Sequence, residues 1–241
     1  MKTGQVVLIL LGVAAAAAVG WLIVRPAFVD GDILTSRQAW EIDFSDPLLI
    51  GDLEDPFAYA GGDAVRERPG TGAIDLGRDG SGSLRLTLEL DGTESILAEG
   101  VDVGGELEIR ASLRAEETDT SGGAIYGSSG RGDARLPETD ALLFGTAQLS
   151  ISIDGETRGA PFEGLWSIAD ALRREDGSIG NQGLIFSPLL RDDTVFSDPS
   201  RLEVTLLVYG RDQGQTDSVV LHTVYRTVDV IRSPEETTSP N

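Results

Sequence analysis

The sequence contains no cysteine, one histidine and one lysine. Without cysteine, disulfide bonds, thiolate metal sites and cysteine nucleophiles are excluded. The lone histidine, His222, excludes any metal site built on two imidazoles. Because Lys2 is the only lysine, a serine–lysine catalytic pair is excluded for the chain beyond its N-terminus. These absences remove most of the common catalytic and metal-binding chemistries.

Positive charge is also scarce. The 241 residues carry 40 acidic against 19 basic side chains, which gives a formal net charge of -21. Such a surface repels nucleic-acid phosphates, so we expect no nucleic-acid partner. An acidic excess with arginine in place of lysine is typical of halophilic proteins, because charge repulsion in molar salt is screened within about 3 Å. A GC-rich genome would explain the same bias, and neither explanation requires bound calcium.

One long hydrophobic run lies near the N-terminus. Residues 6–24 carry no charge, and a helix of this length spans roughly 28 Å, enough for a bilayer core. A cleaved signal peptide could use the alanines at 14–18, but the apolar run is longer than the about 7–15 residues of a signal core. We therefore expect an uncleaved signal anchor that contacts the lipid bilayer through residues 6–24. The protein would then be single-pass, with its C-terminal domain extracytoplasmic.

Alternating apolar and polar residues predict strands in much of the remaining chain. The alternating segments are 40–44, 84–90, 107–113, 147–153, 202–208 and 219–231. This period places one face on a core and the other in water, as in antiparallel sheets. We therefore expect a mainly β fold, an antiparallel β-sandwich or a jelly-roll-like domain. Residues 161–174 instead show helical spacing with arginines at the end, which predicts one short helix.

These patterns divide the chain into four parts. We expect a membrane anchor over 1–28, a stalk and irregular entry with possible edge strands over 29–82, and a β-sandwich domain over 83–232. The polar, proline-containing tail over 233–241 is expected to be disordered.

Residues that could carry catalysis are few. His222 lies in a β-branched segment, and the sequence has no G-x-S-x-G elbow, so we interpret this histidine as structural. Glycoside cleavage needs two neighbouring carboxylates, but among 40 acidic side chains some pair will always lie close together. The presence of such a pair therefore does not indicate a glycosidase. Trp40 and Trp166 could form sugar platforms, but we interpret both as core residues.

Two loops imitate known motifs. Residues 75–83 partly resemble a calcium loop but lack the EF-hand order, so we interpret them as a glycine-rich turn. Residues 121–133 are rich in glycine and serine and end in an Arg-Gly-Asp triplet similar to a cell-adhesion tripeptide. We interpret that segment as a loop joining two strands. No catalytic, cofactor-binding or metal-binding residue is therefore predicted.

The leading functional hypothesis is a non-enzymatic module. We expect a membrane-anchored domain that binds or stabilises an envelope protein or membrane complex. A pilin-like subunit of a surface filament is one alternative, because residues 2–4 resemble a prepilin-peptidase site, although Ile9 replaces the usual glutamate. A glycan-acting enzyme that uses two carboxylates is the other alternative.

Overall fold

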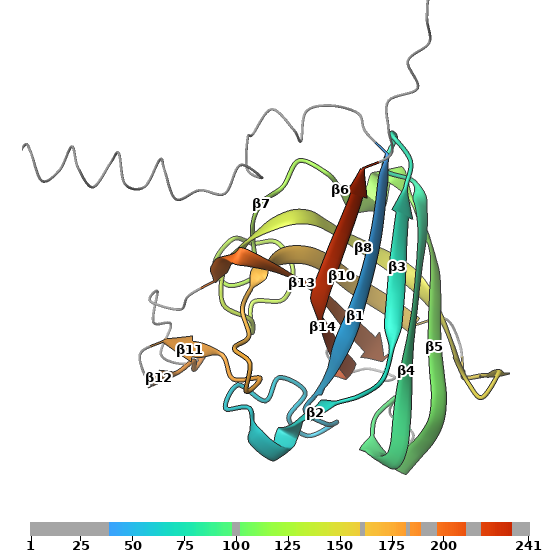
Figure 1. The fold of residues 1–241 in the computed structure, drawn as a ribbon, viewed down its shortest axis with the longest axis vertical. Helices are drawn as coiled ribbons and strands as arrows, with labels where there is room; N and C mark the ends of the chain where they lie inside the picture. Colours follow the sequence, from blue (N-terminus) through green and yellow to red (C-terminus); the bar gives the residue numbers. More distant parts are fainter. Residues whose placement is uncertain are drawn as a thin grey trace, which may run out of the picture. The chain divides into compact units, whose positions relative to one another are not determined.

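Eight long strands follow one another around a closed antiparallel barrel (Figure 1). The computed structural model describes residues 39–97, 102–159, 162–181, 184–188, 197–210 and 218–232. Contacts divide the chain into two units, Met1–Ser36 and Arg37–Asn241, and all described residues belong to the second. In chain order the barrel strands are β1 (Trp40–Ile50), β3 (Thr71–Leu76), β4 (Gly82–Ser95), β5 (Asp102–Leu113), β8 (Thr139–Ile153), β10 (Phe162–Ala171), β13 (Asp198–Gly210) and β14 (Ser218–Arg232).

Short elements lie between the barrel strands. They are η1 (Gly62–Ala64), β2 (Val65–Glu67), η2 (Ala115–Glu117), β6 (Thr118–Asp119), β7 (Gly123–Ile125), β9 (Glu156–Thr157), β11 (Gly180–Asn181) and β12 (Leu184–Ile185). β6 and β7 continue along β8 after β5 has ended, whereas β11 and β12 form a separate two-stranded hairpin.

The predicted sandwich or jelly roll is wrong, because the last strand pairs with the first. β14 runs antiparallel to β1, with Trp40 opposite Arg232 at one end and Leu49 opposite Thr223 at the other. Alternation reveals which residues of a strand face the core, but it does not reveal which strands are neighbours. The strands predicted within 40–44, 84–90, 107–113, 147–153, 202–208 and 219–231 are confirmed. β1 and β3, within the expected stalk region, are full members of the barrel wall.

The helix predicted over 161–174 is also wrong. Its residues form β10, which pairs with β8 on one side and β13 on the other. Six consecutive residues, Gly164–Ala169, are buried, because the inward side lines the barrel and the outward side lies under a second apolar layer. A strand buried on both faces loses the two-residue period, so its apolar positions also match helical spacing.

The membrane assignment requires a correction. Within the part of the chain that the structure describes, no helix is both long and apolar enough to cross a bilayer. The expected anchor over 6–24 lies outside the described residues, as does the tail over 233–241. The single-pass membrane localisation is therefore not supported by the structure.

Large apolar side chains fill the barrel interior. Leu86 of β4 and Ile109 of β5 are at most 1% exposed, and Trp166 and Tyr225 are completely buried. An eight-stranded barrel is just wide enough for side chains to fill its centre. The interior is therefore a hydrophobic core, and a ligand-binding surface should be sought on the outer wall.

A second apolar layer covers the outer side of β8, β10 and β13. Loops after β1, β7 and β10 contribute to this layer, which comprises Phe57, Ile125, Tyr126, Leu136, Ala141, Leu165, Ala169, Leu172, Ile179, Leu207 and Val219. The layer hides this part of the wall from solvent, whereas the outward residues of β4 and β5 stay exposed. The exposed wall is the part that can carry a binding site.

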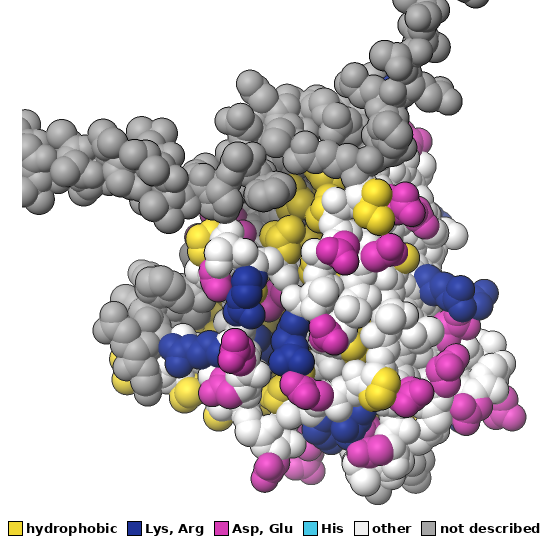
Figure 2. Space-filling view, viewed as in Figure 1, with side chains coloured by type: hydrophobic (Ala, Val, Ile, Leu, Met, Phe, Trp, Pro, Cys, Tyr) yellow, Lys and Arg dark blue, Asp and Glu magenta, His cyan; other side chains and the backbone are white. Residues whose placement is uncertain are grey.

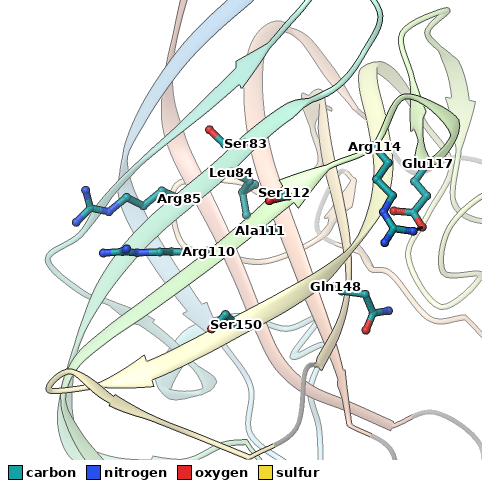
Figure 3. A pocket seen from close by; sticks show the side chains of 10 residues that line it. All are labelled: Ser83, Leu84, Arg85, Arg110, Ala111, Ser112, Arg114, Glu117, Gln148 and Ser150. Atoms are coloured by element: carbon teal, nitrogen blue, oxygen red, sulfur yellow. Dashed lines mark ion pairs between the residues drawn. The ribbon is translucent and has the colours of Figure 1, made fainter.

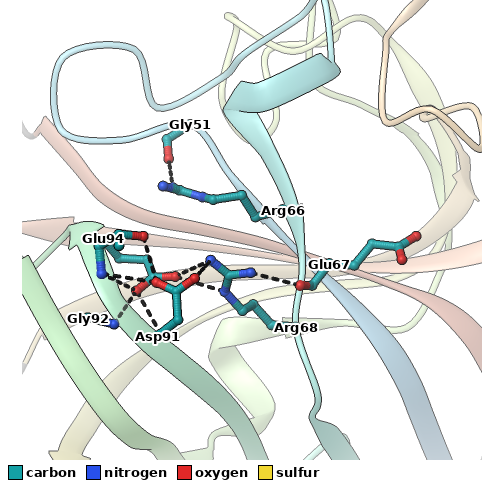
Figure 4. A network of polar contacts seen from close by, with 8 residues as sticks. Gly51, Arg66, Glu67, Arg68, Asp91, Gly92 and Glu94 are labelled. Carbon is teal, nitrogen blue, oxygen red and sulfur yellow. Dashed lines mark hydrogen bonds and ion pairs between the residues drawn. The ribbon is translucent and has the colours of Figure 1, made fainter.

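A buried carboxylate fixes the hairpin between β4 and β5 (Figure 4). The side chain of Glu94 is completely buried, and its Oε1 accepts hydrogen bonds from Arg68 Nε at 2.8 Å and Nη2 at 2.6 Å. Its Oε2 accepts the backbone N–H groups of residues 91–93 at 3.0, 3.1 and 3.2 Å. These five donors satisfy the carboxylate and hold the segment before β3 against the hairpin.

Candidate functional site

An open groove of about 560 Å³ lies on the exposed wall, across β4, β5 and β8 (Figure 3). Eight of its ten lining residues are polar or charged, and the complete set is Ser83, Leu84, Arg85, Arg110, Ala111, Ser112, Arg114, Glu117, Gln148 and Ser150. The polar members project outward at alternate positions of the strands, whereas Leu84 and Ala111 are buried. Hereafter "the groove" means this set of residues.

The groove lies where the pairing between β5 and β8 is interrupted. β5 pairs with β8 up to Ala111 opposite Leu149, and pairing resumes in β6 at Thr118 opposite Gly145. Between these two points the chain leaves β8 through η2. Residues 146–148 of β8 have no partner strand on that side within the described structure, and the local gap opens the wall.

Two arginines stand side by side at the edge of the groove. Arg85 and Arg110 occupy directly opposite positions of β4 and β5, and in Figure 3 they extend in the same direction. Their side chains are 64% and 62% exposed. Like charges at directly opposite positions of a sheet repel each other, so this arrangement requires a counter-charge.

Glu108 holds the two guanidinium groups together. Its Oε1 accepts Nε of Arg85 at 2.7 Å and Nη2 of Arg110 at 2.8 Å, and its Oε2 accepts the same Nη2 at 2.9 Å. These hydrogen bonds, above all those from Arg110, lower the pKa of Glu108. The carboxylate is therefore ionised at neutral pH and keeps both arginines in place.

A third arginine lies on the other side of the groove. Arg114 Nη1 is 3.6 Å from Glu117 Oε1, which is longer than a hydrogen bond. Ser83 lies opposite Ser112, and Arg110 lies opposite Ser150, so hydroxyl groups lie between the charged side chains. The groove thus offers guanidinium, hydroxyl and amide groups on three strands of a rigid wall.

The charge of the groove differs from that of the protein. The lining carries three arginines and one glutamate, Glu117, a sum of +2, and Glu108 beside the lining lowers the local sum to +1. The complete chain carries -21, and Figure 2 shows acidic side chains dispersed over the face with β14, β1 and β3. The groove is therefore positively charged in a protein whose net charge is strongly negative.

The structure places His222 outside the groove, under the loop after β1. Its Nδ1 donates to the backbone oxygen of Pro56 at 2.9 Å, and its ring packs edge-on against Phe57. Nε2 is buried and has no hydrogen-bond partner among the described residues. Burial is the main reason that the pKa of His222 falls to about 3. A neutral, inaccessible imidazole fits the structural interpretation.

The two tryptophans considered as sugar platforms are core residues. Trp166 is completely buried in the barrel, and Trp40 is 6% exposed. A shallow depression beside Trp40 includes Glu41 and Asp75, which lie directly opposite each other on β1 and β3. Both carboxylates are exposed, whereas a glycosidase requires one desolvated acid with a raised pKa. This depression is therefore a poor candidate for glycoside cleavage.

The two motif-like loops are structural. Residues 77–81 form the turn between β3 and β4, in which Asp79 accepts hydrogen bonds from the backbone and hydroxyl of Ser81. No group of three or more possible metal-ligating side chains occurs within the described residues. In the other loop, Asp133 bonds to Arg135 and Tyr209, and Arg131 bonds to Asp119. The Arg-Gly-Asp triplet is thus engaged within the protein.

Sequence reasoning missed the groove. The sequence does show arginines and serines at alternate positions in and beside two predicted strands, at 83–85 and 108–114, and these positions form the polar face. Only the register shows that Arg85 and Arg110 are neighbours, and alternation alone does not fix that register. No family model, curated protein or solved structure matches the chain.

Proposed function

We propose that the barrel is a non-enzymatic binding module that uses the groove to bind a polar ligand. The observation that carries this proposal is the Arg85–Arg110 pair, two exposed like charges at directly opposite positions of neighbouring strands. Repulsion within such a pair opposes folding and Glu108 offsets it, and residues that break a local rule of sheet pairing are expected at functional sites. The proposal retains the binding role inferred from sequence and omits the membrane anchor.

The lining of the groove supports binding more than catalysis. Pockets for small molecules commonly have 300–1,000 Å³ and mostly apolar walls. The groove has a comparable volume, about 560 Å³, but its exposed side chains are polar. Recognition would therefore use hydrogen bonds and charge. Glu117 is the one carboxylate in the lining, and no histidine lies there, so no acid–base pair is assembled. The filament, glycosidase and envelope-partner hypotheses stay predictions.

Binding to printed arrays of oligosaccharides and acidic peptides tests the proposal. The wild type is compared with Arg85→Gln/Arg110→Gln and with Arg226→Gln. Arg226 is a matched control, because it also forms an ion pair on the outer wall but lies on β14, away from the groove. We expect ligands that the wild type and control bind and the double variant loses. Absence of any wild-type binding, or equal binding by all three proteins, would contradict the proposal.

A further inference from the structure

We infer that the ligand of the groove is a uronic acid residue of a saccharide, which presents one carboxylate among several hydroxyl groups. This inference rests on the proposed binding function and specifies the chemistry of the ligand. It is based on the carboxylate already held at the groove, on the local charge, and on the serine and glutamine side chains beside the arginines.

Glu108 shows that the two guanidinium groups accept a carboxylate between them. Its three contacts of 2.7–2.9 Å lie within the range of charge-assisted hydrogen bonds. Each guanidinium has five N–H donors in a planar fork, so Glu108 leaves most donors of Arg85 and Arg110 unused. Both side chains are more than half exposed, and the unused donors are accessible to a second carboxylate.

The charge of the groove favours one negative charge on the ligand. The lining and the adjacent Glu108 together sum to +1, which a single carboxylate neutralises, whereas a polyanion would add negative charge that these residues do not compensate to a protein of net charge -21. Arg114 adds a further donor across the groove, because its 3.6 Å separation from Glu117 leaves that pair loosely associated.

The neutral part of the lining favours a sugar over a peptide. Ser83, Ser112, Ser150 and Gln148 offer hydroxyl and amide groups that can donate to and accept from sugar hydroxyls. The two apolar residues of the lining, Leu84 and Ala111, are buried, whereas peptides are usually anchored by exposed apolar pockets or by strand addition. β4 is paired on both sides, and the interruption along β8 covers only residues 146–148, which is too short for an added strand.

Amide NMR titration at low salt tests the inference. Sodium glucuronate is compared with glucose, sodium N-acetylaspartate amide and sodium sulfate, at concentrations up to the millimolar range. We expect glucuronate to shift the signals of β4, β5 and β8 around the groove and to bind at least tenfold more tightly than glucose. Stronger binding of the amino-acid derivative would assign the groove to acidic peptides, and stronger binding of sulfate would assign it to sulfated ligands; both results overturn the inference.

Arginine variants link the binding to the groove. Arg110→Gln should weaken glucuronate binding at least tenfold, and Arg226→Gln should leave it unchanged. Unfolding midpoints measured in parallel show whether each variant is folded. If glucuronate fails to bind while the array signals still depend on Arg85 and Arg110, the uronate assignment is wrong and the binding function stands. If the arrays show no dependence on these arginines, the binding function fails as well.

Discussion

At the scale of single residues, the charged groups divide into two kinds. Glu94 and Arg68 are largely buried and satisfy one another, so they contribute to the fold. Arg85 and Arg110 lie directly opposite each other and are more than half exposed, so their remaining donors are accessible to a ligand. The sequence does not distinguish the two kinds, because only the three-dimensional neighbours of each charged group show which role it has. The structural role of His222 was predictable, because one imidazole without a nucleophile beside it cannot form a catalytic set.

Removing one partner of the buried ion pair should destabilise the protein strongly. Arg68→Met leaves the carboxylate of Glu94 without its charged donor, and we expect the free energy of unfolding to fall by about 3 kcal/mol. Urea unfolding monitored by tryptophan fluorescence measures the effect. Glu67→Gln removes an ion pair whose carboxylate is 71% exposed, and this control should cost less than about 1 kcal/mol. Equal effects of the two variants would contradict the role assigned to Glu94.

Burial of His222 should make stability depend on pH. The folded protein binds the imidazole proton only near pH 3, whereas the unfolded chain binds it near pH 6.5. Stability is therefore complete above pH 6.5 and decreases as the pH falls towards 3, by about 2 kcal/mol between pH 8 and pH 5. Urea unfolding at several pH values measures this slope. In His222→Asn the slope between pH 5 and 7 should largely disappear; an unchanged slope would show that another group causes it.

At the scale of elements, the sequence predicts strands well when one face is exposed and poorly when both are buried. Leu84 to Leu90 alternate with polar residues, and the strand prediction there is confirmed. Phe162–Ala171 is covered on both sides, so the period is lost and the helix prediction fails. The missing information is the second apolar layer, which is built by loops distant in sequence, such as the one that carries Phe57.

Gly145 lies where β8 is paired with β6 on one side and β10 on the other, and we expect that only glycine fits at this position without loss of stability. A Cβ atom at this position would lie 2.7 Å from the backbone oxygen of Glu117 and 2.9 Å from the indole of Trp166. We expect Gly145→Ala to lower the free energy of unfolding by about 2 kcal/mol through overpacking, measured by urea unfolding. Gly77→Ala is the control, because the added Cβ would lie 3.1 Å from the side chain of Asp79 and 3.4 Å from the backbone oxygen of Ser81, which is a looser fit than at Gly145. An unchanged free energy of unfolding in Gly145→Ala would contradict the described packing of these strands.

At the scale of the whole molecule, net charge follows from composition, but barrel closure does not. Because the net charge is -21, acidic side chains often lie opposite other acidic side chains, as Asp43 does with Asp229 and Glu41 with Asp75. Closure depends on pairing between segments separated by almost the complete domain, and no local pattern specifies it. Composition therefore predicts how the surface responds to salt, whereas topology had to come from the structure.

Added salt should stabilise the folded protein. Added salt shortens the Debye length from about 10 Å at 0.1 M to about 3 Å at 1 M, and the repulsion between acidic side chains is then screened. We expect the thermal midpoint to rise between 0.1 M and 2 M KCl, and Asp43→Asn to be more stable than the wild type at low salt. The gain from Asp43→Asn should fall by roughly half or more at 2 M. A midpoint that falls with KCl, or a gain independent of salt, would contradict the role of surface repulsion.

Closure of the barrel by β1 and β14 is the claim on which the rigid groove wall and the burial of His222 depend. Asp43 and Asp229 are exposed and directly opposite on these strands. Directly opposite positions of antiparallel strands generally have a Cα separation that a disulfide can span. The chain has no cysteine, so Asp43→Cys/Asp229→Cys provides a clean test, with Asp43→Cys/Glu106→Cys as the control because Glu106 lies on β5. Mass spectrometry after mild oxidation of the folded monomer should show an intramolecular disulfide in the first variant and free thiols in the control. Free thiols in both folded variants would contradict the closed barrel.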